Sequence, residues 1–153
     1  MLLSKSCIYG LRASVLLASK NQDNYVNIRE LSDELNISFH FLTKILQQLT
    51  QSQILESYKG PNGGIKLAKT ADSITFMNIV SAIDTDHTIH ECLFGLPGCG
   101  ELKPCPVHDK WSALKEELLE MMNHTTLQDL ADRGSYVDLR EALRDGNDFF
   151  NQK

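Results

Sequence analysis

Three cysteines and a histidine, closely spaced along the chain, have side chains that can bind a metal centre. Cys92 and Cys99 are separated by six residues, Cys99 and Cys105 by five, and His108 follows after two more. Thiolates select zinc, Cu(I) or iron–sulfur clusters. Paired cysteines of zinc sites usually have about two to four residues between them, so the wider spacing favours a cluster. The proline after Cys105 is also common at the end of ferredoxin ligand runs.

The segment that contains the cysteines, residues 91–107, has the composition of a loop. It is rich in Gly and Pro and has no apolar period, so it buries little surface and needs another source of order, such as a bound metal. A disulfide does not suit the cytoplasmic setting that the sequence predicts. Structural zinc and redox-active or buried thiols remain alternatives to a cluster. A small electron-transfer iron–sulfur protein is one function that such a cluster would fit.

Charge and hydropathy restrict the class of protein. The net charge of −5 is unevenly distributed: residues 1–70 have eight Lys/Arg and five Asp/Glu, whereas residues 71–153 have seven and fifteen. The modestly basic first half predicts that any DNA contact lies there. The longest apolar run, residues 15–18, is far shorter than the roughly 20 residues that span a bilayer, and no secretory signal is recognisable. We therefore expect a cytoplasmic protein without a membrane partner.

The first half predicts a helix-turn-helix followed by a wing. Ser4 can cap a helix that runs to about residue 20, Asn27 a short helix that ends near Asn36, and Ser38 a third helix. The second and third helices are amphipathic and closely connected, as in a helix-turn-helix. Strands over residues 54–58 and 65–67 flank a Gly-rich turn and predict a β-hairpin. The predicted fold class is mainly α with a small β-hairpin wing: a winged helix-turn-helix plus a long dimerisation helix.

The second half predicts two further helices and a capping box. One helix is expected over residues 72–84, and a long one from His108 to about His124. Thr126 and Asp129 can form a capping box for a short helical turn after it. We divide the chain into a winged helix-turn-helix DNA-binding domain (1–83), a cysteine-rich cluster-binding loop (84–107), a dimerisation helix with a short following helix (108–131) and a polar C-terminal tail (132–153).

The third helix and the wing supply the candidate DNA contacts. In a helix-turn-helix the second helix of the motif enters the major groove with its N-terminal residues at the base edges. Gln47 can pair with adenine, Lys44 can meet guanine or a phosphate, and Phe39 or Phe41 can touch a thymine methyl. A solvated polar surface is the alternative for each. The predicted DNA-binding residues are Ser38, His40, Phe41, Thr43, Lys44, Gln47, Lys59, Pro61 and Asn62.

Apolar residues spaced three and four apart form a stripe along the long helix. The stripe is too short for an independent coiled coil, but paired with its copy it would bury a useful apolar surface. Packing within one chain is the alternative. We expect a homodimer that binds a palindromic double-stranded operator. The predicted interface residues are Trp111, Leu114, Leu118 and Met121.

Several segments together resemble one known family. They are the opening LSK…YGLRA (3–13), the helix pair IRELS…IS (28–38), the wing KGPNGGIKL (59–67), the three cysteines and TLQDL (126–130). On these motifs, residues 1–131 resemble the iron–sulfur cluster regulators that include IscR and the nitric-oxide sensor NsrR. The resemblance implies a dimeric transcriptional regulator, not an enzyme, that senses redox state, nitric oxide or iron–sulfur supply. A cluster-free regulator that acts through thiol oxidation or a protein partner is the alternative function.

The resemblance implies three cysteine ligands and leaves the fourth ligand open. In IscR-like members a histidine closes the site, and His108 stands at that place. In NsrR-like members a carboxylate early in the partner's first helix does so, but the corresponding residue here is Ile8, which has no donor atom. Cys7 lies one residue earlier, about 100° around the helix. A histidine ligand implies a 2Fe–2S cluster, with 4Fe–4S as the alternative. The predicted metal ligands are Cys92, Cys99, Cys105 and His108.

Overall fold

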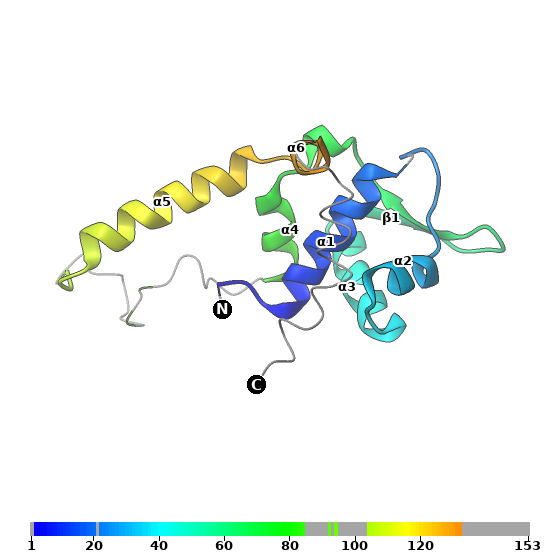
Figure 1. Cartoon of the computed structure of the whole chain (residues 1–153), viewed down its shortest axis with the longest axis horizontal. Coiled ribbons are helices and arrows are strands. Elements are labelled where there is room, and N and C mark those ends of the chain that lie inside the picture. The colour runs from blue at the N-terminus through cyan, green and yellow to red at the C-terminus, as the bar shows by residue number, and fades with distance from the viewer. Residues whose placement is uncertain (1, 21, 85–91, 93, 95–103, 133–153) are drawn as a thin grey trace.

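The computed structural model describes residues 2–20, 22–84, 92, 94 and 104–132. Figure 1 shows a helical body with a β-hairpin at one end and a projecting helix at the other. The elements are, in order, α1 (Lys5–Ser19), α2 (Ile28–Leu35), α3 (Phe39–Gln51), β1 (Leu55–Tyr58), β2 (Gly64–Leu67), the 3₁₀ helix η1 (Ala71–Ser73), α4 (Phe76–Ile83), α5 (His108–His124) and α6 (Leu127–Asp132).

Each of the first three helices begins at the capping residue that the sequence predicted. Ser4 Oγ accepts a hydrogen bond from the amide of Cys7, 3.0 Å away. Asn27 Oδ1 and Ser38 Oγ accept in the same way at the starts of α2 and α3. Asn36 ends α2 in the left-handed conformation with φ of 51°, which Asn tolerates better than most residues. The predicted helix-turn-helix is therefore confirmed as α2 and α3.

The wing is an antiparallel hairpin that is also attached to the segment before α2. Leu55 pairs with Leu67 at its base, and Tyr58 with Gly64 next to the turn. Val26 forms an isolated bridge with Ile65, with N–H···O distances of 2.8 and 2.9 Å in the two directions. The sequence predicted the hairpin but not this third strand segment, because a single residue has no alternating pattern.

Gly64 permits the bridge, and replacing it should loosen the wing. A Cβ at this position would lie 2.2 Å from the carbonyl oxygen of Val26, so Gly64→Ala must push two backbones apart. We expect the free energy of unfolding to fall by about 1–3 kcal/mol, measured by urea denaturation. Asn62→Ala, in the exposed turn of the same hairpin, is the control and should stay near wild type. Equal stability of both variants would show that the bridge contributes nothing.

The helix expected over residues 72–84 is shorter than predicted. Ile74 is extended, with φ of −108° and ψ of 117°, and it separates η1 from α4. Thr75 and Asn78 then form a capping box at the start of α4. A Thr followed three residues later by a side chain that can reach back is a strong helix start, and it takes precedence over the apolar spacing that includes Ile74.

One hydrophobic core includes residues from all the helices, α1 through α6. Met122, at the end of α5, and Leu127, in α6, are buried together with the apolar residues of α1 to α4.

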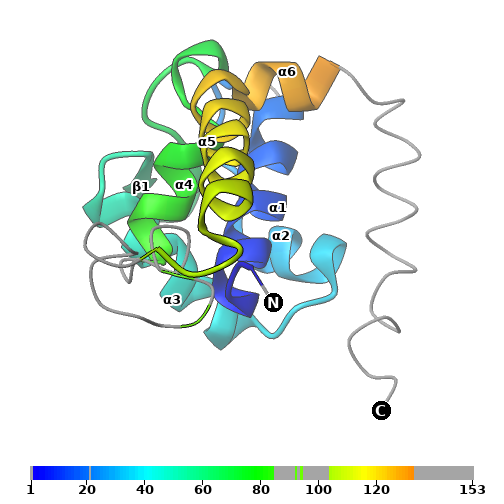
Figure 2. The same cartoon turned by 90° about the vertical axis from the view of Figure 1, so that its left-hand side faces the viewer.

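The predicted capping box is present at the start of α6: Thr126 N–H donates to Asp129 Oδ2 at 2.9 Å, and Asp129 N–H donates to Thr126 Oγ1 at 3.0 Å. Met122 is the one fully buried residue of α5. The helix extends away from the body in Figure 1, and Figure 2 views it from its projecting end, in front of the body. Nowhere in the described ranges is a helix long and apolar enough to cross a membrane.

Candidate DNA interface and cysteine site

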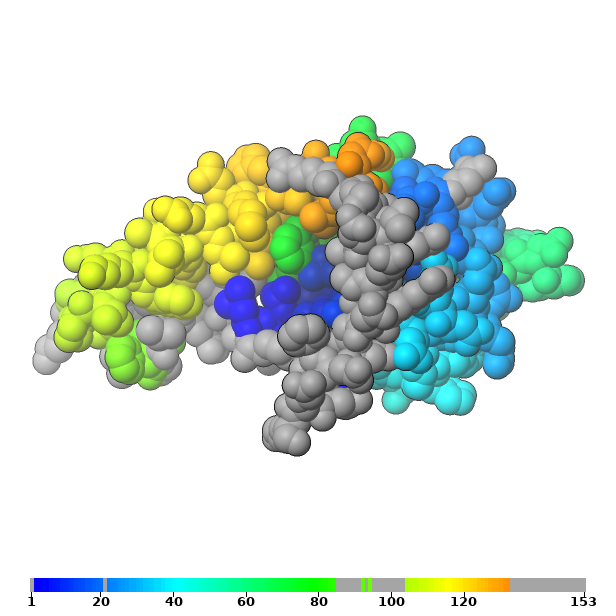
Figure 3. Space-filling model, viewed as in Figure 1, coloured from blue at the N-terminus to red at the C-terminus, as the bar shows by residue number. Residues whose placement is uncertain are grey.

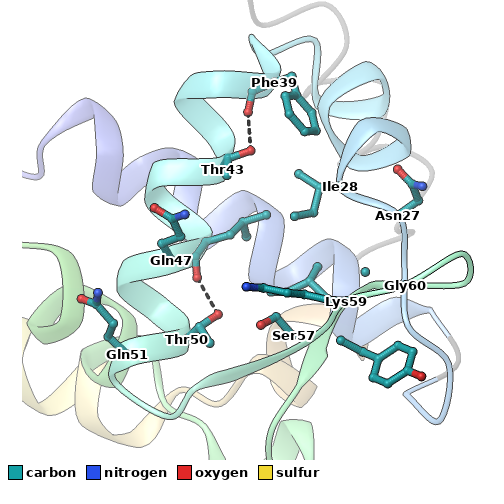
Figure 4. A pocket seen from close by; sticks show the side chains of 15 residues that line it. Asn27, Ile28, Phe39, Thr43, Gln47, Thr50, Gln51, Ser57, Lys59 and Gly60 are labelled. Atoms are coloured by element: carbon teal, nitrogen blue, oxygen red, sulfur yellow. Dashed lines mark hydrogen bonds between the residues drawn. The ribbon is translucent and has the colours of Figure 1, made fainter.

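A groove of about 650 Å³ separates α3 from the wing. Figure 4 shows α3 side chains along one wall, the start of α2 at one end and wing residues opposite. The floor contains apolar side chains and the rim contains amides, hydroxyls and a lysine. The lining residues are Asn27 and Ile28; Phe39, Thr43, Leu46, Gln47, Thr50 and Gln51; and Ser57, Tyr58, Lys59, Gly60, Gly63, Gly64 and Ile65.

Helical spacing determines which residues of α3 reach this groove. Phe39, Thr43 and Gln47 are four residues apart and share one face of the helix. Thr43 Oγ1 donates to the carbonyl of Phe39 at 2.7 Å, and Thr50 Oγ1 donates to that of Leu46 at 2.8 Å (Figure 4). Their hydroxyl protons are thus used within the helix, whereas Gln47 is exposed and lines the groove.

Three predicted contacts near the start of α3, Ser38, His40 and Lys44, are exposed but differ in the interactions they make within the protein. The Ser38 hydroxyl accepts the capping hydrogen bond from the Phe41 amide, which fixes its orientation. The His40 ring lies edge-on to the Phe39 ring, with centroids 5.7 Å apart. Lys44 lies one residue further around the helix than Thr43 and is exposed to solvent. None of these three side chains lines the groove.

Phe41, another of the predicted DNA contacts, faces the core and is not among the residues that line the groove. Its ring packs edge-on against Tyr9 of α1, with centroids 5.8 Å apart, and it is half-buried against the core. Phe39 lines the groove in its place. The guanidinium of Arg29 lies 5.0 Å from the Phe39 centroid. Arg29 was not among the predicted contacts; it occupies the first turn of α2, and the first helix of such a motif crosses the DNA backbone.

The wing carries Lys59, Pro61 and Asn62, all exposed as the prediction requires. Lys59 lines the groove and lies on its wing side in Figure 4. Pro61 and Asn62 occupy the turn between β1 and β2. The backbone there is held by a hydrogen bond from Gly63 N–H to Gly60 O, 2.9 Å long. The three predicted residues therefore form one exposed tip.

Charged and aromatic side chains form a cluster between the wing and Tyr25, in the segment before α2. Glu56 accepts a hydrogen bond from Tyr25 Oη at 2.6 Å and pairs with Lys66 Nζ at 3.2 Å. Lys66 Nζ also lies 4.9 Å from the Tyr25 centroid. The hydrogen bond with Tyr25, followed by that with Lys66, lowers the pKa of Glu56, and the same bond raises the pKa of Tyr25. The Lys66 ammonium group is thus engaged by Glu56 and by the Tyr25 ring.

The structure describes two of the three candidate cysteines and the histidine. Cys92, Cys105 and His108 are all partly exposed. His108 is the first residue of α5, and its N–H donates to the carbonyl of Cys105 at 2.9 Å. Cys99 lies outside the described residues. Within the described part of the chain, no three His, Cys, Asp or Glu side chains are grouped closely enough to hold a metal.

Cys7, the other candidate for the fourth ligand, is a core residue. It has no exposed surface. Burial, then the negative charge of Asp84 and a hydrogen bond with it, raises the pKa of Cys7 to about 12. Asp84 also accepts hydrogen bonds from the backbone and side chain of Ser4. The thiol is therefore protonated at neutral pH and enclosed.

The apolar stripe of α5 is partly covered. Leu114 and Met121 are 59% and 48% exposed, whereas Trp111 and Leu118 are half-buried. Figure 3 shows the helix as an arm that protrudes from the body. Exposure of two large apolar side chains on a protruding helix is typical of an interface.

Comparisons with known proteins agree with this architecture. A family model named Rrf2, "Iron-dependent Transcriptional regulator", matches residues 3–133. A protein of Aquifex aeolicus named as an HTH-type transcriptional regulator is 34% identical, covering 85% of this chain and 91% of its own length. NsrR of Bacillus licheniformis is 30% identical, covering 80% and 86%. IscR of Pectobacterium carotovorum is 26% identical, covering 87% and 80%.

Solved structures show the same fold at lower identity. CymR of B. subtilis, titled the global cysteine regulator, superposes with a TM-score of 0.75 at 24% identity, covering 86% of this chain and 97% of that one. IscR of T. potens gives 0.67 at 20% identity, covering 92% and 89%. With the family match over residues 3–133 and the winged helix-turn-helix of α2, α3 and the hairpin, this chain belongs to the Rrf2 family of DNA-binding transcriptional regulators, which are not enzymes.

Proposed function

We propose that this protein is a homodimeric regulator whose DNA binding depends on an iron–sulfur cluster held by Cys92, Cys99, Cys105 and His108. The observation that carries the proposal is the turn at the start of α5, where Cys105 and His108 are hydrogen-bonded through their backbones and partly exposed. The turn places a thiol and an imidazole three residues apart beside a helix N-terminus. In the cytoplasm, such a regulator would report redox state, nitric oxide or iron–sulfur supply.

The donor set suits such a cluster. Three thiols and an imidazole are ligands of iron–sulfur clusters, and hard cations such as Mg²⁺ prefer oxygen donors. The N-terminus of α5 has no side-chain cap, and the amides there favour a negatively charged neighbour. A bound cluster would supply reversible electron transfer and reactivity toward oxidants and nitric oxide. The chain contributes the ligands, the helix end and the connection to the core through Met122.

His108 suits the fourth position better than Cys7. The imidazole is partly exposed and begins α5 next to Cys105. The Cys7 thiol is buried and its pKa is raised to about 12, so binding a metal would require both deprotonation and movement of α1. A single histidine among cysteine ligands favours 2Fe–2S over 4Fe–4S by the resemblance to IscR.

One specific observation favours a second function. The fold also matches CymR, a protein titled the global cysteine regulator. A regulator that responds to thiol chemistry without a cluster would use the same α3 and wing. This alternative predicts that DNA binding is unchanged after all iron is removed, whereas the cluster proposal predicts a change in affinity.

Anaerobic purification distinguishes the two functions. The cluster proposal predicts visible absorbance with equivalent iron and acid-labile sulfide, and a change of DNA affinity when a chelator strips the metal under anaerobic, reducing conditions that keep the thiols reduced. Binding would be measured by fluorescence anisotropy on a duplex selected from a random pool by the purified protein. A colourless protein with iron-independent binding would support the thiol alternative.

The DNA-reading surface makes a separate prediction at Lys44 and Gln47. Lys44→Ala should lower the steepness of the log–log salt dependence by about 0.9, the effect of one phosphate contact. Gln47→Ala should cost about 1–3 kcal/mol at a single base pair, read by competition among duplexes with each position changed. Gln48→Ala, on the next exposed residue outside the groove, is the control. Equal losses for Gln47→Ala on selected and random duplexes would show that Gln47 does not read sequence.

A further inference from the structure

An exposed aromatic side chain forms part of the wing wall of the groove. Tyr58 is the last residue of β1 and remains 57% exposed. It lines the groove together with Phe39 and Gln47 of the opposite wall. A tyrosine combines a large apolar ring with a hydroxyl that needs a hydrogen-bond partner, which suits a surface that is covered on binding.

The Tyr58 ring is supported from behind. It packs against the Tyr25 ring, with centroids 5.6 Å apart and an angle of 38° between the planes. Tyr25 in turn donates its hydroxyl hydrogen bond to Glu56, which also pairs with Lys66. Tyr25 is itself held in place by its neighbour Val26, which forms the backbone bridge with Ile65. Tyr58 is therefore presented on a braced part of the wing.

The charges around Tyr58 suit a phosphate backbone. Glu56 is the one acidic residue of the wing; its carboxylate is paired with the Lys66 ammonium group and accepts a hydrogen bond from the Tyr25 hydroxyl. Lys59, the residue after Tyr58, is exposed. An anionic ligand that approaches the groove thus meets a cation and an aromatic hydroxyl, with the neighbouring carboxylate already paired.

The arrangement of the two walls indicates which part of DNA meets Tyr58. In the proposed placement, the helix that reads bases lies in a major groove and the wing beside it meets the adjacent minor groove. The sugar–phosphate ridge between those two grooves must then pass between α3 and the wing. The apolar floor formed by Ile28, Leu46 and Ile65 suits deoxyribose, whose exposed surface is largely apolar.

We propose that Tyr58 is a further DNA-contacting residue, whose ring packs on a deoxyribose and whose hydroxyl donates to a phosphate of the ridge between the two grooves. Tyr25 is its positioning residue. The inference rests on the proposed placement of α3 and the wing on DNA. It assigns Tyr58 a contact with the backbone, so the residue contributes affinity without base preference.

Affinity measurements on the full-length protein test this assignment. The probes are a duplex of about 30 base pairs, enough for two half-sites one helical turn apart, selected by the wild-type protein from a random pool, and an unselected duplex of equal length. Tyr58→Ala should weaken binding to both by at least about tenfold, and Tyr58→Phe by about threefold. Neither should lower the salt slope, because the hydroxyl is uncharged, whereas Lys59→Ala should lower it by about 0.9.

A crosslink separates direct contact from support of the wing. Benzoyl-phenylalanine at position 58 should crosslink to the selected duplex on irradiation, whereas the same group at Lys69, which lies outside the groove, should not. Wild-type affinity of Tyr58→Ala, or no crosslink from position 58, would overturn the assignment while leaving DNA binding intact. Failure of the wild-type protein to bind either duplex would instead reject the proposed DNA surface, and the assignment with it.

Discussion

Cys105→Ala should abolish the visible absorbance of anaerobically purified protein and reduce bound iron and sulfide to background. Cys105 and His108 form the described edge of the proposed site, at the start of α5. Removing one thiolate leaves a cluster with three of its four ligands, and the remaining position is open to water. Because metal binding also stabilises the segment that supplies its ligands, the apparent unfolding temperature should fall as well. Cys92→Ala and Cys99→Ala should behave in the same way.

Two other substitutions serve as matched controls for this result. Cys7→Ala removes a thiol from the core, not from the proposed site, so it should lower stability while the absorbance spectrum is retained. His108→Ala should allow assembly of a more labile or spectrally shifted cluster. Loss of the cluster in Cys7→Ala together with its retention in His108→Ala would place the fourth ligand on α1. Retention of full iron in Cys105→Ala would remove this residue from the ligand set.

Local signals predicted most of the fold. Ser4, Asn27 and Ser38 are capping residues placed before amphipathic segments, and each cap requires only its own few neighbours. The wing followed from a Gly-rich turn between two short β-rich runs. These features depend on interactions within a few residues, which is why a single sequence was sufficient to locate them.

Features that depend on distant contacts were not predictable. The bridge between Val26 and Ile65 joins residues far apart in sequence. The orientation of Phe41 depends on Tyr9 of another helix, although its spacing of four from the buried Ile45 was a usable signal. The support of Tyr58 likewise required Tyr25 and Glu56 to meet across the fold. Sequence spacing could propose the cysteine ligands, but their convergence is a property of three dimensions.

Leu114→Asp should convert the protein from dimer to monomer. Leu114 is 59% exposed on the protruding part of α5, and on a helical wheel it lies beside Met121, with Met122 turned toward the core. In a twofold-symmetric dimer the substitution acts twice. Burying an unpaired carboxylate in place of a leucine should cost at least about 2 kcal/mol in each copy. The dissociation constant should therefore rise by roughly 10³-fold, as measured by sedimentation equilibrium.

The choice of Leu114 keeps this experiment interpretable. Leu118 contacts the core, so a charge there would disturb folding and assembly together, whereas Leu114 is mainly in solvent within one chain. Ala113→Asp places the same charge on an exposed neighbour, about 100° around the helix, and should leave the dimer intact. Circular dichroism should be unchanged for both variants. A Leu114→Asp protein that sediments as the wild-type dimer would exclude this face of α5 from the interface. A monomer that also loses DNA affinity, with α3 and the wing unaltered, would indicate that both DNA-binding domains of the dimer are needed to bind a palindromic operator.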